Sequence, residues 1–253
     1  MSSRVLGLFG IVLALGAAAA LAEVKPTIPA GYAVYQTTAL NPRESGVAGV
    51  LQILQDERVT SKYRDGWGSS REPETVLPEG DPLLKSIAGT PLRNGRLRLV
   101  GDGGQVIADK PFEVPLGKLE TAFLYGGEFP TYLVTVDYGI GFGSYNGPAT
   151  MLAEVRGGRL GFVQAVGDKD PIRLAETLKH GWRFVDAAKG RGKEIEEIDC
   201  HPNFDNPKWE DRSEFVVIYT TYRFDGRHWR ASSRQTIGFW ENEGDWPARS
   251  QFP

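Results

Sequence analysis

EFVVIYTTYRF, residues 214–224, carries the clearest structural signal in the chain, because nearly all of its residues are β-branched or aromatic. Asp225 and Gly226 follow it, and HWRASSRQTI, residues 228–237, forms a second extended run. Two such runs joined by an Asp-Gly turn are typical of a β-hairpin. The sequence therefore predicts paired antiparallel strands on either side of this turn.

Other pairs of extended segments recur along the chain, each interrupted by a glycine-rich or polar turn. YLVTVDY at 132–138 precedes a glycine-rich loop, and TMLAEVR at 150–156 turns through two glycines into RLGFVQAV at 159–166. Similar pairs lie at 95–100 with 105–109 and at 182–185 with 195–200. These pairs predict a mainly β fold of antiparallel hairpins that form a sandwich, a barrel or an irregular propeller-like assembly.

Helical signals are few, and we expect one or two short helices. IRLAETLK at 172–179 has apolar residues at helical spacing after Asp170-Pro171, which predicts a short helix. Residues 47–54 fit either a strand or a buried helical turn. We expect residues 23–253 to form a single β-rich domain, and a division into two lobes would fall near 111–130.

The first 22 residues have the three parts of a cleavable signal peptide. Arg4 supplies a positive charge, residues 5–19 are uncharged and mostly apolar, and Ala20-Leu21-Ala22 provides the small residues of a cleavage site. The apolar run is short for a membrane span, and no second long run follows. We therefore predict a soluble mature chain that is periplasmic or secreted and has no stable membrane insertion after cleavage.

Charge and cysteine content narrow the class of protein further. The chain has 29 lysines and arginines against 32 aspartates and glutamates, and its formal net charge is −3. This weak acidity, without any block of like charge, argues against a nucleic-acid partner. Cys200 is the one cysteine, so no internal disulfide can form, and we expect it to be buried and inert.

The loop VDYGIGFGSYNGPAT at 136–150 is rich enough in glycine to suggest a phosphate site. It lacks the spacing of a dinucleotide-binding loop and the Gly-Lys-Ser/Thr ending of a P-loop, and a strand rather than a helix is expected after it. We therefore predict a wide hairpin connection in which glycines provide unusual backbone angles. The candidate binding residues here are Asp137, Phe142, Tyr145 and Asn146.

The segment DCHPNFD at 199–205 places polar residues at alternate positions, as a calcium loop does. Phe204 stands where such a loop requires glycine, and His201 offers nitrogen where calcium prefers oxygen. The segment therefore predicts a polar loop with Asx turns, with Asp199, His201 and Asp205 as candidate binding residues. The three histidines show no zinc spacing. We accordingly predict no metal site, no cofactor and no catalytic residue from a local motif.

These features favour a non-catalytic, extracytoplasmic binding protein of a bacterial cell envelope that recognises a protein partner, as an inhibitor or immunity factor does. One alternative is a secreted hydrolase that uses carboxylates, for which the candidates are Asp137, Asp199, Asp205 and Glu241. Another is a small-ligand carrier, which needs a largely apolar cavity. The aromatic C-terminal stretch 239–253 is expected to pin the chain end onto the core.

Overall fold

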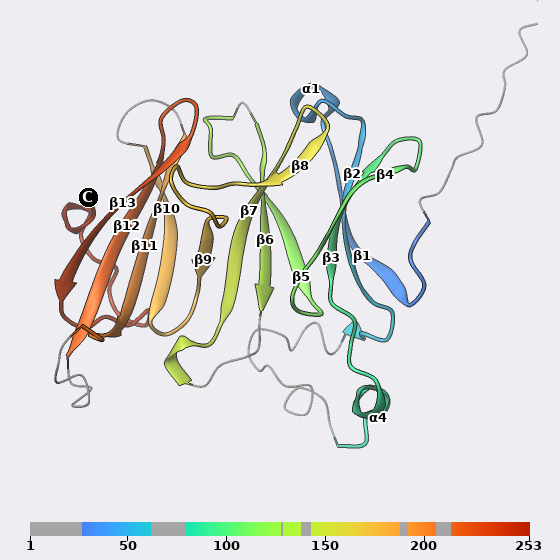
Figure 1. Cartoon of the computed structure of the whole chain (residues 1–253), viewed down its shortest axis with the longest axis horizontal. Coiled ribbons are helices and arrows are strands. Elements are labelled where there is room, and N and C mark those ends of the chain that lie inside the picture. Colours follow the sequence, from blue (N-terminus) through green and yellow to red (C-terminus); the bar gives the residue numbers. More distant parts are fainter. Residues whose placement is uncertain (1–26, 62–78, 128, 138–142, 188–191, 206–213) are drawn as a thin grey trace, which may run out of the picture.

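The structure is a computed structural model that describes residues 27–61, 79–127, 129–137, 143–187, 192–205 and 214–253 (Figure 1). The predicted signal peptide at 1–22 and the candidate binding residue Phe142 lie outside these ranges. Buried apolar residues are distributed over the described ranges and form several hydrophobic clusters.

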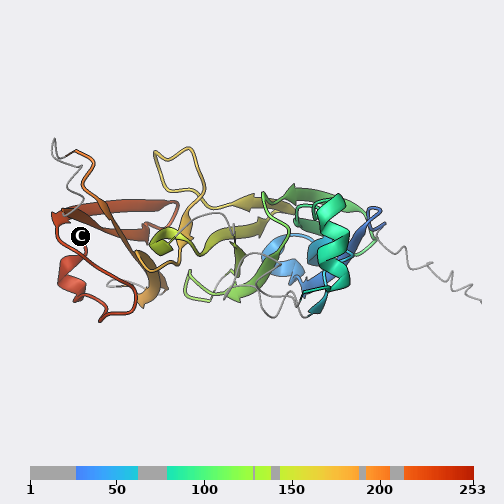
Figure 2. The ribbon, with the colours of Figure 1, turned by 90° about the horizontal axis from the view of Figure 1, so that it is seen from below.

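Three antiparallel sheets follow one another along the chain and along the long axis of the molecule (Figures 1 and 2). The first sheet contains β1 (Tyr32–Ala39), β2 (Gly49–Asp56), β3 (Arg96–Gly101) and β4 (Val106–Pro111). The second contains β5 (Gly117–Ala122), β6 (Thr131–Asp137), β7 (Pro148–Arg156) and β8 (Arg159–Phe162), with β9 (Arg173–Ala175) paired to β7. The third contains β10 (His180–Asp186), β11 (Lys193–Pro202), β12 (Phe215–Phe224) and β13 (Trp229–Ile237). The predicted mainly β, antiparallel fold is confirmed, and in the described part of the chain no sheet closes into a barrel.

The second sheet is the middle layer, because residues from both of its faces belong to hydrophobic cores. Val134 and Val136 of β6 pack in one core with Leu97 of the first sheet. Leu133, which points to the opposite face of β6, packs in another core with Ile195 of the third sheet. Burial on both faces explains why β6 reads as an almost continuous apolar run, and each fully buried aliphatic side chain contributes roughly 1.5–3 kcal/mol.

The predicted hairpin near the C-terminus is confirmed as β12 and β13, which pair from Phe224 with Trp229 onward. The Oδ1 atom of Asp225 accepts hydrogen bonds from the backbone N–H groups of Arg227 and His228, both at 2.9 Å. The aspartate therefore orders the turn by an Asx-type contact. β13 begins at Trp229, one residue later than expected.

The helix expected at 172–179 is wrong. Residues 173–175 form strand β9, which pairs with β7, and Leu174 is fully buried in the core between the second and third sheets. Residues 47–54, left open between strand and helix, belong largely to β2. Two α-helices lie within the described ranges, α1 (Pro42–Ser45) and α4 (Pro82–Gly89), and each has a proline in its first turn after a capping side chain, Asn41 or Asp81.

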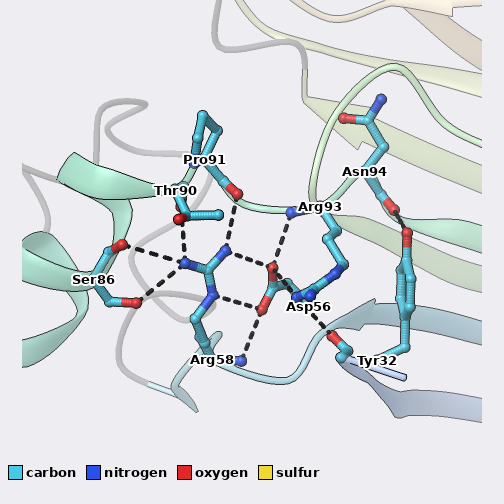
Figure 3. A network of polar contacts seen from close by, with 9 residues as sticks. Tyr32, Asp56, Arg58, Ser86, Thr90, Pro91, Arg93 and Asn94 are labelled. Atoms are coloured by element: carbon cyan, nitrogen blue, oxygen red, sulfur yellow. Dashed lines mark hydrogen bonds and ion pairs between the residues drawn. The ribbon is translucent and has the colours of Figure 1, made fainter. Parts of the chain in front are cut away.

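Asp56, the last residue of β2, is fully buried and joins β2 to α4 through arginines (Figure 3). Its carboxylate accepts hydrogen bonds from Nη2 of Arg58 at 2.7 Å and from the backbone N–H of Arg93 at 2.9 Å. The same Arg58 guanidinium donates to the carbonyl oxygens of Thr90 and Pro91 at 2.8 and 2.9 Å. Arg58 thus satisfies backbone acceptors that the end of α4 leaves open.

A glutamine side chain links the first and second sheets at the edge strand β5. Oε1 of Gln36 accepts from the backbone N–H of Leu119 at 2.9 Å, and its Nε2 donates to the carbonyl oxygen of Leu119. The side-chain amide therefore makes with Leu119 the two hydrogen bonds that the backbone of an adjacent strand would make. A register irregularity between Val34 and Gln36 accompanies this contact in the pairing of β1 with β2.

Replacing Gln36 by alanine is expected to lower the free energy of unfolding by about 2 kcal/mol, because both backbone groups of the buried Leu119 lose their partner. Thr37→Ala, at an exposed position of the same strand, is the matched control. Urea unfolding followed by far-UV circular dichroism measures both. Equal stability of the two variants would show that Gln36 does not hold the sheets together.

Candidate functional site

The glycine-rich loop is a hairpin connection, as predicted. A short 3₁₀ turn, η1 (Gly143–Tyr145), lies in it, and β7 begins at Pro148 directly after Gly147. Because a strand and not a helix N-terminus follows, the phosphate interpretation has no structural support. Position 147 requires glycine because the backbone of Glu176 lies close to it: a Cβ atom there would lie 1.9 Å from the carbonyl oxygen of Glu176.

The structure brings one candidate from each group, Tyr145 and Asp199, together at His180. Nε2 of His180 lies 2.7 Å from Oδ1 of Asp199, and its ring meets the exposed ring of Tyr145 edge-on with centroids 5.9 Å apart. Asn146 is buried nearby in the chain. Asp137 ends β6 opposite Pro148, and its side chain lies outside the described part of the structure.

His201 and Asp205 lie at another place, in a hollow at the open end of the third sheet. We call it the terminal hollow; its volume is about 440 Å³ and its lining residues are His201, Asn203, Phe204, Asp205, Val216, Gln235, Thr236 and Ile237. The imidazole of His201 stacks on Phe204 with centroids 5.8 Å apart. Phe204 is 64 % exposed and Ile237 is 59 % exposed, as is Phe239 just beyond β13.

Metal and thiol chemistry find little support in this region. Within the described ranges, no three His, Cys, Asp or Glu side chains are grouped so that they could hold a metal ion. Cys200 is fully buried, which confirms the expected burial, and burial raises the pKa of its thiol. Its Sγ atom accepts a hydrogen bond from the backbone N–H of Trp240 at 3.4 Å.

The C-terminal stretch packs over the far face of the third sheet, as expected. Trp240 and Phe252 are buried in a core with Tyr219, although Phe239 stays exposed. Arg249 adds an ion pair, with its Nη2 atom 2.6 Å from Oε2 of the buried Glu194. Glu241, a candidate acid for the hydrolase alternative, pairs with the buried Lys179 at 2.7 Å and so belongs to this attachment.

Glu197 of β11 is an unusual acid that the sequence did not single out. Burial between the second and third sheets raises its pKa to about 7, although a hydrogen bond from Tyr222 at 2.9 Å and the nearby His180 oppose the shift. A carboxyl group with a pKa near neutrality can exchange protons at physiological pH. The only sequence signal was its position in a strand, which does not reveal what covers it.

A second hollow lies where two hairpin turns from different sheets approach each other, and we call it the arginine cleft. Its volume is about 480 Å³. The turn between β7 and β8 brings Arg156 and Arg159, and the turn between β12 and β13 brings Arg227 and His228. Gly157 and Gly158 both have positive φ, +54° and +72°, as a two-residue turn of this hairpin type requires.

Aromatic side chains form the floor of the arginine cleft. The rings of Tyr125, Phe224 and Trp229 contact one another with centroids 4.6 to 5.9 Å apart. Nε1 of Trp229 donates to the hydroxyl of Tyr125 at 2.7 Å, and that hydroxyl donates to Glu154. Sequence reasoning missed this site because its residues come from turns that are distant in the chain. The basic residues that flank both turns were the one sequence feature that pointed to it.

Within the described residues, no helix combines the length and apolar character needed to cross a membrane. Comparison of the chain with protein-family models, with curated proteins and with solved structures finds no match.

Proposed function

We propose that this chain is a non-catalytic, extracytoplasmic binding protein of a bacterial cell envelope, and that it recognises a protein partner through the terminal hollow. The observation that carries the proposal is the exposure of Phe204 and Ile237 in that hollow. Exposed large apolar side chains that gather at one place are characteristic of interaction sites. The signal-like N-terminus supports export, which gives such a protein its place in the envelope.

The edge of the third sheet supports the same proposal. β13 is the last strand of its sheet, and eight of its nine residues are exposed. On the side away from β12, its backbone pairs among the described residues only at Trp229, which contacts the segment at Ala165 and Val166. An unpaired edge can accept a strand from another chain. A partner that fills the terminal hollow would therefore find free backbone groups beside it.

The proposal is tested by affinity capture from an envelope extract of the producing organism, with the mature chain as bait. Ile237→Asp is expected to abolish the stoichiometric capture of the partner, because it places a charge at the rim of the terminal hollow. Ile107→Asp is the matched control, since Ile107 is 40 % exposed on β4 of the first sheet. Capture that survives Ile237→Asp, or the lack of any stoichiometric partner, would contradict the proposal.

The hydrolase alternative has one observation in its favour. The pair of His180 and Asp199 lies close to Glu197, whose pKa of about 7 suits general acid–base chemistry. The other expected acids lie elsewhere: Asp205 lines the terminal hollow and Glu241 pairs with Lys179. A panel of ester, amide and glycoside substrates tests the alternative, which requires an activity that Glu197→Gln removes.

The carrier alternative fits the two hollows less well. Both the terminal hollow and the arginine cleft open to solvent and expose polar as well as apolar atoms. A carrier of apolar molecules needs an enclosed and largely apolar cavity.

A further inference from the structure

We propose that the arginine cleft is a binding site for a small aromatic anion. The acidic group of the ligand, a carboxylate or a phosphate, lies between Arg159 and Arg227, and its planar body rests on the aromatic floor. This site is independent of the partner surface proposed above. β13 begins at the arginine cleft with Trp229 and ends at the terminal hollow with Ile237, and strand geometry places these residues roughly 27 Å apart.

The distribution of charge in the cleft favours an anion. Arg156 is neutralised by Glu154, with Nε and Oε2 2.8 Å apart. Among the described residues, no carboxylate lies within ion-pair distance of Arg159 or Arg227, whereas Arg156, Arg159, Arg227 and His228 all line the same volume. Guanidinium groups without a carboxylate partner are suited to paired hydrogen bonds with carboxylate or phosphate oxygens.

The acid nearest to this turn does not cancel that charge. Asp225 accepts from the backbone N–H groups of its own turn, and its Oδ2 atom lies 2.5 Å from Nε of Arg230. These contacts hold the pKa of Asp225 well below its usual range, with the backbone hydrogen bond of His228 the largest cause. Asp225 therefore pairs with the backbone of its turn and with Arg230, and it does not neutralise the Arg227 guanidinium.

The floor of the cleft is fixed before any ligand arrives. Trp229 is 3 % exposed, and the hydrogen bonds from Trp229 to Tyr125 and from Tyr125 to Glu154 satisfy the polar tips of both aromatic residues. The guanidinium of Arg156 lies 4.8 Å from the centre of the Tyr125 ring and 5.0 Å from that of Phe129, which fixes it between the two rings. A preformed floor reduces the entropy that binding must cost.

Size and shape limit the ligand to a small molecule. A volume of about 480 Å³ lies in the range of small-molecule sites, and both apolar and polar surface line it. A fused two-ring body with one acidic group matches this combination of an aromatic floor and a cationic rim.

Three probes test the proposal on the purified mature chain: 2-naphthoate, 2-naphthyl phosphate and the neutral 2-naphthamide. Isothermal titration calorimetry gives the affinities, and the indole N–H resonance of Trp229 in NMR spectra reports occupancy of the cleft. We expect saturable binding of at least one anion, with a shift of the Trp229 signal, and binding of the amide at least tenfold weaker. Stronger binding of the phosphate or of the carboxylate identifies the acidic group that the site prefers.

Arg159→Gln and Arg227→Gln are each expected to weaken anion binding about tenfold, which corresponds to roughly 1.4 kcal/mol. Arg234→Gln is the matched control, because Arg234 lies on the exposed part of β13 against Tyr219 and outside the cleft. Arg159 and Arg227 are both exposed, so the variants should fold, and unchanged thermal unfolding checks this.

Three outcomes would overturn the proposal. These are no saturable binding of either anion below about 10 mM, equal binding of the amide, or anion affinity that Arg159→Gln and Arg227→Gln leave unchanged. None of these outcomes affects partner capture through the terminal hollow, so the two proposals are tested independently.

Discussion

Asp56→Ala is expected to lower the free energy of unfolding by about 3 kcal/mol or more, the largest single effect that the structure suggests. Removal of one member of a buried ion pair typically costs about 3–5 kcal/mol, and the lower end applies here because the Arg58 side chain is 22 % exposed. Here the substitution also frees the backbone N–H of Arg93 and releases Arg58, which holds the carbonyl oxygens at the end of α4. The substitution should therefore weaken the attachment of α4 to the first sheet.

Urea unfolding of the mature chain at pH 7 measures this effect. Asp186→Ala is the control, because Asp186 also pairs with a cation, Lys193 at 2.6 Å, but its side chain is 88 % exposed. The control is expected to change stability little, since exposed ion pairs contribute little. If both variants are as stable as the unmodified chain, the Asp56 network does not stabilise the fold.

The same network predicts a loss of stability in acid. Burial alone would raise the pKa of Asp56, but hydrogen bonds from the Arg58 side chain and from the Arg93 and Arg58 backbone outweigh it and hold the pKa well below its usual range. A lowered pKa means that this stabilisation is complete above about pH 4, where the unfolded chain is ionised, and is lost as the pH falls further. Asp56→Ala should lack this part of the acid dependence.

Elements whose cause lies in one continuous stretch of sequence were predictable, and elements that depend on packing between distant segments were not. The β12–β13 hairpin was predictable because its strand propensity and its Asp-Gly turn lie in one continuous stretch. The failed helix at 172–179 shows the opposite case: Leu174 pairs through β9 with β7 and fills a core between two sheets, and this long-range packing overrides the local helical spacing. The capped starts of α1 and α4 were local signals that propensity alone did not bring out.

The candidate sites were harder to predict because they are assembled from distant segments. His201 and Asp205 are four positions apart and line the same hollow, so their proximity follows from one local stretch of sequence. Arg159 and Arg227 are separated by most of the third sheet, and only the packing of two sheets brings their turns to one cleft. Glu197 likewise owes its raised pKa to burial in the folded chain, which outweighs the lowering effect of hydrogen bonds from Tyr222 of β12 and from the backbone of Ala175 in β9.

Glu197→Gln is expected to change the pH dependence of stability in the direction opposite to that of Asp56. Because burial raises the pKa of Glu197 to about 7, the folded chain must either bind a proton or keep a charge in a poorly hydrated place. Its contribution is therefore most favourable below about pH 4.5 and is lost as the pH rises toward 7, by up to about 3 kcal/mol. Glutamine carries no charge and keeps an oxygen that can accept the hydrogen bond from Tyr222.

Urea unfolding at pH 5 and pH 8 measures this effect as the difference in free energy between the two conditions. In the unmodified chain, Glu197 should favour stability at pH 5, and Glu197→Gln should remove most of that preference and stabilise the chain at pH 8. Glu243→Gln, on the exposed C-terminal stretch, is the control for loss of one carboxylate. His180, Asp199 and Tyr222 face Glu197 and are unchanged in both variants, so a difference between the variants belongs to Glu197. A pH dependence that Glu197→Gln leaves intact would mean that this carboxylate is already well solvated in the folded chain, and its suitability for proton transfer near neutral pH would be lost with it.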